Sequence, residues 1–201
     1  MTVPPPPAGR VLFSGELVDT EATEALGRRL AGLLRAGDLL VLTGPLGAGK
    51  TTLTRGLGAG LQVRGQVASP TFVLARTHPT ASGVPLVHVD AYRLGGADEL
   101  DDLDLDYEGS VVVVEWGAGL LDGVAESWLD VVIERPTGAG GELGDDGRDP
   151  EGLPDPEGRP DPDGLADSDS DPCPDDVADE PRRLTITAHG PRWEGVRLTT
   201  G

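Results

Sequence analysis

The segment from Gly44 to Thr51, which reads GPLGAGKT, constrains this chain more than any other feature, because it holds the only lysine among the 201 residues. The other fifteen basic residues are arginines. An ammonium is a compact point charge and a guanidinium is a planar fork, so a position that keeps lysine against this background is expected to need the point charge. The spacing of glycine, four residues, glycine, lysine and threonine is typical of the loop that binds the phosphates of a nucleoside triphosphate.

The residues that flank this loop favour the same interpretation. Leu39 to Leu42 is a continuous apolar run, as expected of a parallel strand covered on both faces, and a helix is expected from Lys50 to about Leu61. In such a loop the backbone N–H groups converge on phosphate oxygens, and the following helix presents its positive end to the same anion. Lys50 is predicted to bridge the β- and γ-phosphates of ATP, and the Thr51 hydroxyl to ligate Mg²⁺. The predicted nucleotide contacts of the loop are Gly44, Leu46, Gly47, Ala48, Gly49, Lys50, Thr51 and Thr52.

The rest of the chain predicts an α/β fold. Apolar residues at helical spacing favour a helix over residues 20–36, with Asp19 or Thr20 as its N-cap and Gly37 at its end. Strands that alternate with crossover helices are typical of the three-layer fold of P-loop nucleoside triphosphatases, with a mostly parallel central sheet. The remaining expected elements are strands at 11–13, 71–76, 84–89, 111–114 and 129–133, a short acidic helix at 98–107, and a C-terminal hairpin of strands 184–188 and 193–198.

Composition divides the chain into four segments. Residues 136–181 hold 16 acidic residues and 2 arginines, a balance of −14, so the other 155 residues carry only −5 of the net charge of −19. This stretch has almost no aliphatic side chains, cannot bury enough apolar surface to offset chain entropy, and is predicted to be a disordered acidic insertion. A proline-rich tail over residues 1–9 is also predicted to be disordered. The predicted ATPase domain is then residues 10–135, completed by residues 182–201.

Composition also narrows the class of protein. No apolar run approaches the length of a membrane span, and no basic-then-apolar leader is present, so we expect a cytoplasmic protein with no membrane partner. Cys173 is the only cysteine, which leaves no disulfide framework or cysteine metal site. The acidic balance argues against tight direct binding of nucleic acid, which needs a basic surface.

Two acidic residues follow predicted strands and are candidates for the chemistry. Glu115 comes directly after Val111 to Val114, and Asp90 comes after the run at 84–89. Ligands meet an open α/β sheet at the carboxyl ends of its strands, so both acids are predicted to serve the site. Spacing alone leaves open which of them contacts Mg²⁺ and which orients water. His88 shares a strand face with Asp90 but is interpreted as a packed strand residue, and Trp116 as a core anchor rather than a lid over the nucleotide.

Four segments together closely resemble the TsaE (YjeE) family, the bacterial ATPase of tRNA threonylcarbamoyladenosine biosynthesis. The resemblance covers residues 11–135 well and the last twenty residues weakly, and the histidine-containing and Glu-Trp segments are more selective than the phosphate loop. The four segments are Gly44 to Thr52, Ser69 to Phe72, His88 to Leu94, and Val114 to Trp116.

The resemblance implies a slow, Mg²⁺-dependent ATP hydrolase that regulates the TsaB–TsaD transferase complex. That complex places the threonylcarbamoyl group on the adenosine beside the anticodon of tRNAs that read codons starting with A, so tRNA is met only through the complex. By the same resemblance Lys50, Asp90 and Glu115 would be catalytic, and Thr51 and Glu115 would hold the metal. The resemblance also implies nucleotide contacts from Asp19, Thr20 and Arg183, and a switch role for the loop that begins at Ser69. The acidic insertion departs from the family pattern and places the contribution of Arg183 in question.

Two other functions stay open. A small-molecule kinase shares the phosphate loop, but kinases bring basic residues on a lid, and residues 95–133 contain no lysine or arginine. A nucleotide-responsive binding module with little hydrolysis is the second alternative, in which Arg93 is the one arginine close enough in sequence to Asp90 to assist in cis. A GTPase is excluded, because its Asn-Lys-x-Asp element needs a second lysine.

Overall fold

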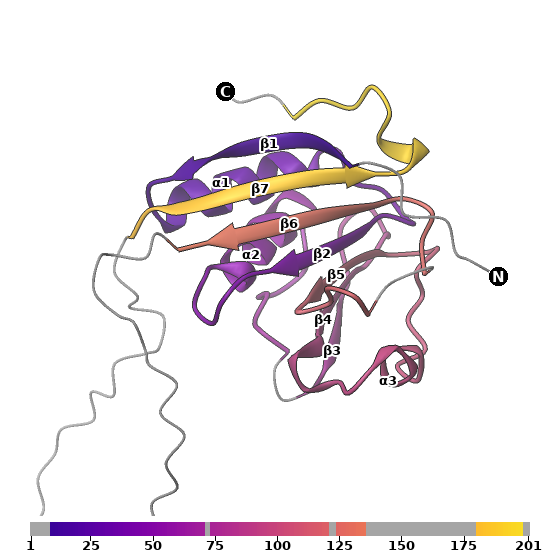
Figure 1. Ribbon diagram of the computed structural model, residues 1–201. Coiled ribbons are helices and arrows are strands. Elements are labelled where there is room, and N and C mark those ends of the chain that lie inside the picture. The colour runs from indigo at the N-terminus through magenta and orange to yellow at the C-terminus, as the bar shows by residue number, and fades with distance from the viewer. Residues whose placement is uncertain (1–8, 71–72, 121–123, 136–179, 199–201) are drawn as a thin grey trace, which may run out of the picture. The chain divides into compact units, whose positions relative to one another are not determined.

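The structure is a computed structural model that describes residues 9–70, 73–120, 124–135 and 180–198 (Figure 1). The predicted N-terminal tail, apart from residue 9, lies outside these ranges. So does the predicted disordered insertion, apart from residues 180 and 181. None of the helices in the described ranges is long and apolar enough to cross a membrane.

The described residues form one seven-stranded sheet in the order β1-β7-β6-β2-β5-β4-β3 (Figure 1). The four strands from β6 to β4 run parallel, whereas β1, β7 and β3 pair antiparallel with their neighbours. The predicted α/β fold with a mostly parallel centre is therefore confirmed. The strands are β1 Arg10–Leu17, β2 Leu39–Thr43, β3 Ala75–His78, β4 Leu86–Asp90, β5 Val111–Glu115, β6 Trp128–Glu134 and β7 Arg182–His189.

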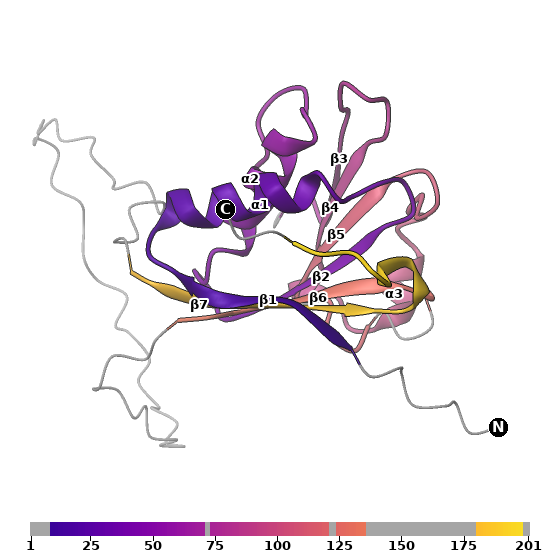
Figure 2. The ribbon, with the colours of Figure 1, turned by 90° about the horizontal axis from the view of Figure 1, so that it is seen from above.

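Helices cover the two faces of the sheet in different ways. Helices α1 (Thr20–Ala31) and α2 (Lys50–Gly60) lie together on one face, and the short helix α3 (Ala97–Asp101) lies on the other (Figure 2). Each face has its own apolar cluster: Leu26, Leu53 and Val113 belong to the first, and Leu100 and Val112 to the second. Two single-turn 3₁₀ helices follow strands, η1 (Ala91–Arg93) after β4 and η2 (Pro191–Trp193) after β7.

Glycines let α1 and α2 pack closely. A Cβ on Gly27 would lie 2.5 Å from the Leu53 carbonyl oxygen, and a Cβ on Gly56 would lie 2.3 Å from the Glu24 carbonyl oxygen. The same glycines that weaken α2 as an isolated helix therefore allow it to reach Gly60, because tertiary packing outweighs intrinsic propensity.

Several expected boundaries were wrong. Helix α1 ends at Ala31 rather than residue 36, α3 is shorter than the predicted 98–107, and the strand expected at 71–76 begins only at Ala75. The C-terminal hairpin does not form, because both edges of β7 are already paired, with β1 and β6. The segment after β7 instead turns through η2, and Trp193, only 1% exposed, closes the core beside α1 and α2.

Candidate nucleotide and metal site

The loop between β2 and α2 is shaped by three glycines. Gly44, Gly47 and Gly49 have φ angles of 157°, 73° and 105°, in the region that side chains disfavour. Gly49 is also the N-cap of α2, so the loop leads directly into the first helical turn. Leu46 at the tip is 86% exposed, whereas Ala48 is buried. This geometry is that of an anion-binding loop followed by a helix N-terminus.

Lys50 lies buried under the loop. Its Nζ donates hydrogen bonds to the carbonyl oxygens of Gly44 at 2.9 Å and Pro45 at 3.0 Å, and lies 3.7 Å from the centroid of the Trp116 ring. Burial lowers the pKa of the Lys50 ammonium from its usual range, and the charges of Glu115 and Asp90 act against that shift. The ammonium is thus held beside the loop with two carboxylates in its field.

Glu115 joins the end of β5 to the start of α2. Its Oε1 accepts a hydrogen bond from the Thr51 hydroxyl at 2.9 Å and lies 2.8 Å from Nε2 of His88. The residue is 4% exposed. The predicted metal residues Thr51 and Glu115, far apart in sequence, therefore come into direct contact.

Asp90 lies next to Glu115, because the two residues are register partners at the ends of the parallel strands β4 and β5. The Asp90 Oδ1 accepts a hydrogen bond from the Tyr92 backbone N–H at 3.0 Å, which caps η1, and the residue is 6% exposed. The structure thus brings together Lys50, Thr51, Asp90 and Glu115, as expected for carboxyl ends of adjacent parallel strands.

Arg182, rather than the predicted Arg183, lies beside the loop. A Cβ on Gly49 would lie 3.3 Å from the Arg182 Nε, and Arg182 is 4% exposed while Arg183 is exposed. Successive side chains of a strand point to opposite faces, and Arg182 shares its face with the core residues Leu184 and Ile186. The nucleotide contact expected from Arg183 stays a prediction, but Arg182 is the arginine of β7 that lies beside Gly49, a register that sequence alone could not fix across the insertion.

A second arginine borders the loop. Nη1 of Arg135 would lie 3.6 Å from a Cβ on Gly47, and its Nη2 pairs with Glu180 Oε2 at 2.5 Å. Sequence reasoning missed Arg135. The only signal was its place at the end of β6, directly before the acidic insertion.

Asp19 and Thr20 stand at the entrance of α1. The Asp19 Oδ1 accepts a hydrogen bond from the Ala22 N–H at 2.6 Å, so the predicted N-cap is confirmed as Asp19. Leu17 is the register partner of Arg182, which places this entrance at the loop end of the sheet. The nucleotide contact expected from Asp19 and Thr20 stays a prediction.

The structure tests the interpretations of Trp116 and His88. Trp116 is only half-buried and has a φ of 64°; its ring lies against Lys50 and 5.2 Å from the Tyr92 ring, so the core-anchor interpretation was wrong. His88 is fully buried on β4, which confirms its interpretation as a packed strand residue, and its ring also contacts Glu115. Its two-residue spacing from Asp90 was the signal that could have revealed this.

The residues fit a magnesium ion. Hydroxyl and carboxylate oxygens, as in Thr51 and Glu115, are the hard ligands Mg²⁺ prefers, and phosphate oxygens and water usually complete its octahedron. In the described ranges no group of three or more His, Cys, Asp or Glu side chains could hold a metal by itself. An ion held by Thr51 and Glu115 would take its other ligands from phosphate oxygens and water. For the anion, the buried Arg182 Nε has no hydrogen-bond partner among the described residues and can donate to it.

A phosphate loop between a central parallel strand and a helix, with acids at the ends of the adjacent strands, defines a P-loop nucleoside triphosphatase fold. Residues 17–140 match the model of one family of this class, described as "Threonylcarbamoyl adenosine biosynthesis protein TsaE". The chain belongs to the TsaE family, whose members take part in tRNA threonylcarbamoyladenosine biosynthesis.

Individual relatives agree with this assignment. The protein named tRNA threonylcarbamoyladenosine biosynthesis protein TsaE in Streptomyces coelicolor is 50% identical over 172 residues, which are 84% of this chain and 91% of the relative. The protein of the same name in Bacillus subtilis is 39% identical over 121 residues, 59% of this chain and 75% of the relative. The crystal structure of Bacillus subtilis YdiB superposes with a TM-score of 0.58 at 26% identity and covers 93% of this chain and 91% of its own.

Proposed function

We propose that this chain is a Mg²⁺-dependent ATP hydrolase whose nucleotide state regulates a TsaB–TsaD transferase complex that forms threonylcarbamoyladenosine on tRNA. One observation carries the hydrolytic part. Thr51 at the start of α2 and Glu115 at the end of β5 are hydrogen-bonded at 2.9 Å, with Lys50 and Asp90 beside them. Phosphoryl transfer to water requires a lysine that binds phosphate, a hydroxyl and a carboxylate that hold the metal, and a further acid.

The roles of the residues follow from their contacts. Backbone N–H groups of the loop bind phosphate oxygens, and Lys50 exchanges the Gly44 and Pro45 carbonyls for the β- and γ-phosphates. Thr51 and Glu115 would hold Mg²⁺, which would supply positive charge to the transferred phosphoryl group. Because Glu115 is the acid bonded to Thr51, Asp90 is left to orient the attacking water. Arg182, beside Gly49, binds the same phosphates from the sheet side.

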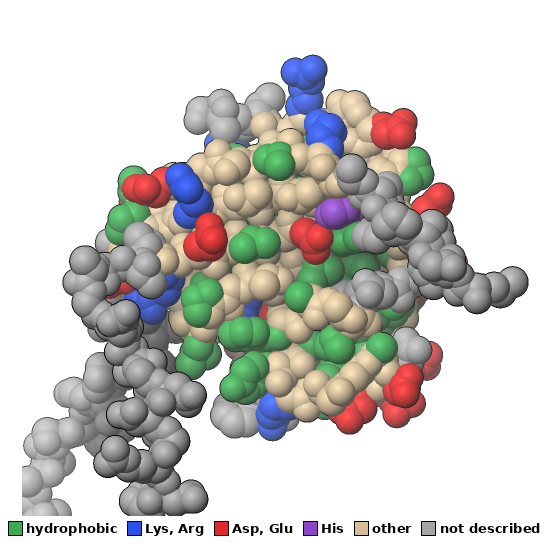
Figure 3. All heavy atoms as spheres, in the orientation of Figure 1, with side chains coloured by type: hydrophobic (Ala, Val, Ile, Leu, Met, Phe, Trp, Pro, Cys, Tyr) green, Lys and Arg blue, Asp and Glu red, His purple; other side chains and the backbone are tan. Residues whose placement is uncertain are grey.

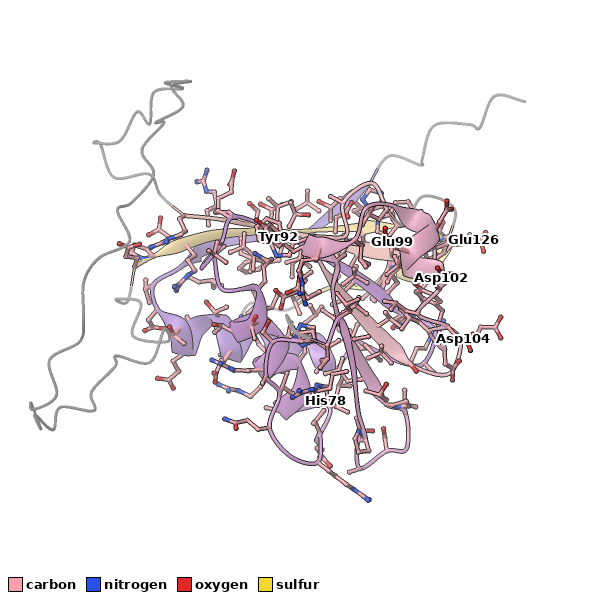
Figure 4. All side chains as sticks on the ribbon, turned by 90° about the horizontal axis from the view of Figure 1, so that it is seen from below. His78, Tyr92, Glu99, Asp102, Asp104 and Glu126 are labelled. Carbon is pink, nitrogen blue, oxygen red and sulfur yellow. The ribbon has the colours of Figure 1, made fainter. Side chains whose placement is uncertain are left out.

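The acidic surface around α3 argues against the kinase alternative. The α3 region is acidic, and red side chains gather over it at the lower right of the space-filling view (Figure 3). Glu99, Asp102 and Asp104 lie at that side together with Glu126 (Figure 4). A lid that stabilises a transferring phosphoryl group needs positive charge, which this region does not offer.

The binding-module alternative differs from the proposal in the rate of hydrolysis. Arg182 and Arg135 border glycines of the loop, and slow turnover is expected where a partner must supply further positive charge. We therefore expect slow hydrolysis by the chain alone. Its site of action would be the cytoplasm, as a partner of TsaB and TsaD, with tRNA held mainly by those proteins because this chain carries a net charge of −19.

Glu115→Gln tests the hydrolytic assignment. The variant is expected to bind ATP but to lose about 100-fold or more in turnover, since it weakens the hold on Mg²⁺, whose charge stabilises the transition state by several kcal/mol. Glu134→Gln, at the exposed end of β6, is the matched control and should turn over as the parent does. Unchanged turnover in Glu115→Gln would refute the assignment.

A pull-down tests the regulatory part. The chain, immobilised with and without ATP, is expected to retain TsaB and TsaD in a nucleotide-dependent way. Filter binding of tRNA to the isolated chain should be weak and lost as salt is raised. Tight, salt-resistant tRNA binding by the chain alone would contradict the indirect role.

A further inference from the structure

We propose that His88 is a positioning residue that holds the Glu115 carboxylate in place for the metal. The inference deepens the proposed function and rests on it for the identity of Glu115 as a metal ligand. His88 is 0% exposed on β4, between β5 and the edge strand β3, and its Nε2 lies 2.8 Å from Oε1 of Glu115 on β5. Neither the phosphate loop nor the two strand-end acids require a histidine at this place.

The contact fixes which ring nitrogen carries hydrogen. A carboxylate oxygen can only accept, so Nε2 of His88 donates and Glu115 receives. The other nitrogen, Nδ1, is buried and has no hydrogen-bond partner among the described residues. A hydrogen on Nδ1 would therefore be an unpaired buried donor, which agrees with a single hydrogen placed on Nε2.

Two donors bond to the same carboxylate oxygen of Glu115. Oε1 of Glu115 accepts both the Thr51 hydroxyl, at 2.9 Å, and the His88 ring. If Thr51 held Mg²⁺, it would do so through an oxygen lone pair, and its hydrogen could still be donated to Glu115. His88 is the second donor on the same oxygen, and its contact with Glu115 would not involve the ion.

The backbone makes His88 suited to this task. It lies in the middle of β4, opposite Val113 of β5 and Arg76 of β3, so its main chain is fixed on both sides. Groups that orient a metal ligand from behind in this way typically change metal affinity by about 10–100-fold when they are removed.

A purely packing role for His88 is the competing explanation, and three substitutions separate the two. His88→Gln keeps an N–H donor at about the reach of Nε2. His88→Asn keeps the amide but shortens its reach, and His88→Leu keeps apolar bulk without a donor. Positioning predicts that only the glutamine restores the parent behaviour, whereas packing predicts that leucine does at least as well.

The test measures binding rather than turnover. A fluorescent ATP analogue is titrated into the full-length chain and each variant, first in EDTA and then at increasing Mg²⁺ concentration, with a thermal melt as a check of folding. The Mg²⁺ concentration that gives the half-maximal change in analogue binding is expected to rise about 10–100-fold in His88→Leu and His88→Asn. In His88→Gln it is expected to stay close to the value of the parent chain. Affinity in EDTA should be the same in all four proteins, because the side-chain contact that the structure gives His88 is with Glu115 and not with the phosphate loop.

The outcomes distinguish a failure of the positioning role of His88 from a failure of the proposed ATPase function. If the parent chain binds no nucleotide, or binds it without any Mg²⁺ effect, the proposed function fails. If the parent responds to Mg²⁺ and His88→Leu or His88→Asn responds at the same concentration, the positioning role is overturned. Equal shifts in His88→Gln and His88→Leu would overturn it as well.

A second measurement needs no substitution. Nitrogen-15 NMR of the histidine rings in the unmodified chain should show His88 with its hydrogen on Nε2, both free and with Mg²⁺ and the analogue bound. A hydrogen on Nδ1 alone in either state would contradict the proposal, because Nε2 could then donate nothing to Glu115.

Discussion

Arg192 and Asp38 form a two-hydrogen-bond ion pair that ties the C-terminal segment to the start of the central strand. Arg192 Nε lies 3.0 Å from Oδ1 and Nη2 lies 3.0 Å from Oδ2, and Nη2 also donates to the Leu33 carbonyl at 2.7 Å. Asp38 is 3% exposed and directly precedes β2, the strand that carries the phosphate loop. The residues after the acidic insertion are thus part of the support of the site.

Arg192→Met is expected to lower the free energy of unfolding by about 3 kcal/mol, because it leaves the buried Asp38 carboxylate without its charged partner. The measurement is urea denaturation. Arg183→Met, on the exposed face of β7, is the control and should change stability by less than about 0.5 kcal/mol. Equal effects in the two variants would mean that the ion pair does not contribute.

Arg182→Met and Arg183→Met form a matched pair for nucleotide binding. Arg182→Met removes one charge-assisted hydrogen bond and should lower the affinity for ATP about 10-fold. Arg183→Met should leave this affinity unchanged, since Arg182 is the arginine of the pair that lies against Gly49. Equilibrium titration with a fluorescent ATP analogue measures both. A larger loss at Arg183 would show that the register at the start of β7 is wrong.

Gly56→Ala should destabilise the protein by about 1–3 kcal/mol, because the new methyl group would lie 2.3 Å from the Glu24 carbonyl oxygen and force α1 and α2 apart. Gly32→Ala is the control: its φ is −65° and the nearest atom to its Cβ would be 3.4 Å away. Thermal melting compares the two. Equal melting temperatures would contradict the close helix packing.

His78 should make stability depend on pH. It is 5% exposed at the end of β3 (Figure 4), and burial, aided by the positive charge of Arg76, lowers its pKa from 6.5. The unfolded chain then binds more protons than the folded one between the lowered pKa and 6.5, so stability falls as the pH drops through that window.

The slope from His78 cannot exceed about 1.4 kcal/mol per pH unit for one proton. Urea denaturation from pH 7.5 to 5 measures it. His78→Gln should remove the His78 part of the slope, and the control His189→Gln should retain it. An identical pH profile for the parent and His78→Gln would reject this origin.

Replacing residues 137–179 by a short turn should leave nucleotide affinity unchanged. β6 and β7 are antiparallel neighbours, and Glu134 is the register partner of Arg183, so a few residues suffice to join them while Arg135, Glu180 and Arg182 are kept. Closing the shorter loop should stabilise the fold by about 2 kcal/mol. Weaker ATP binding in this variant would mean that the insertion contributes to the site.

Local sequence determined the parts of the site that lie close together along the chain. The glycine spacing, the apolar run of β2 and the start of α2 at Lys50 follow from local chemistry. Asp90 and Glu115 could be predicted as site residues because ligands bind at the carboxyl ends of the parallel strands in open α/β sheets. The Asp19 cap is similarly local, since a side chain three residues away satisfies it.

Tertiary structure decided what depends on pairing across the sheet. Whether Arg182 or Arg183 meets the loop depends on the register of β7 against β1 and β6, and a shift of one residue exchanges the two faces. The contact of His88 with Glu115, the place of the Trp116 ring over Lys50, and the failure of residues 193–198 to form a strand likewise depend on neighbours far away in sequence. The local sequence determines which donor and acceptor groups a residue has, but burial and strand register determine which groups they contact.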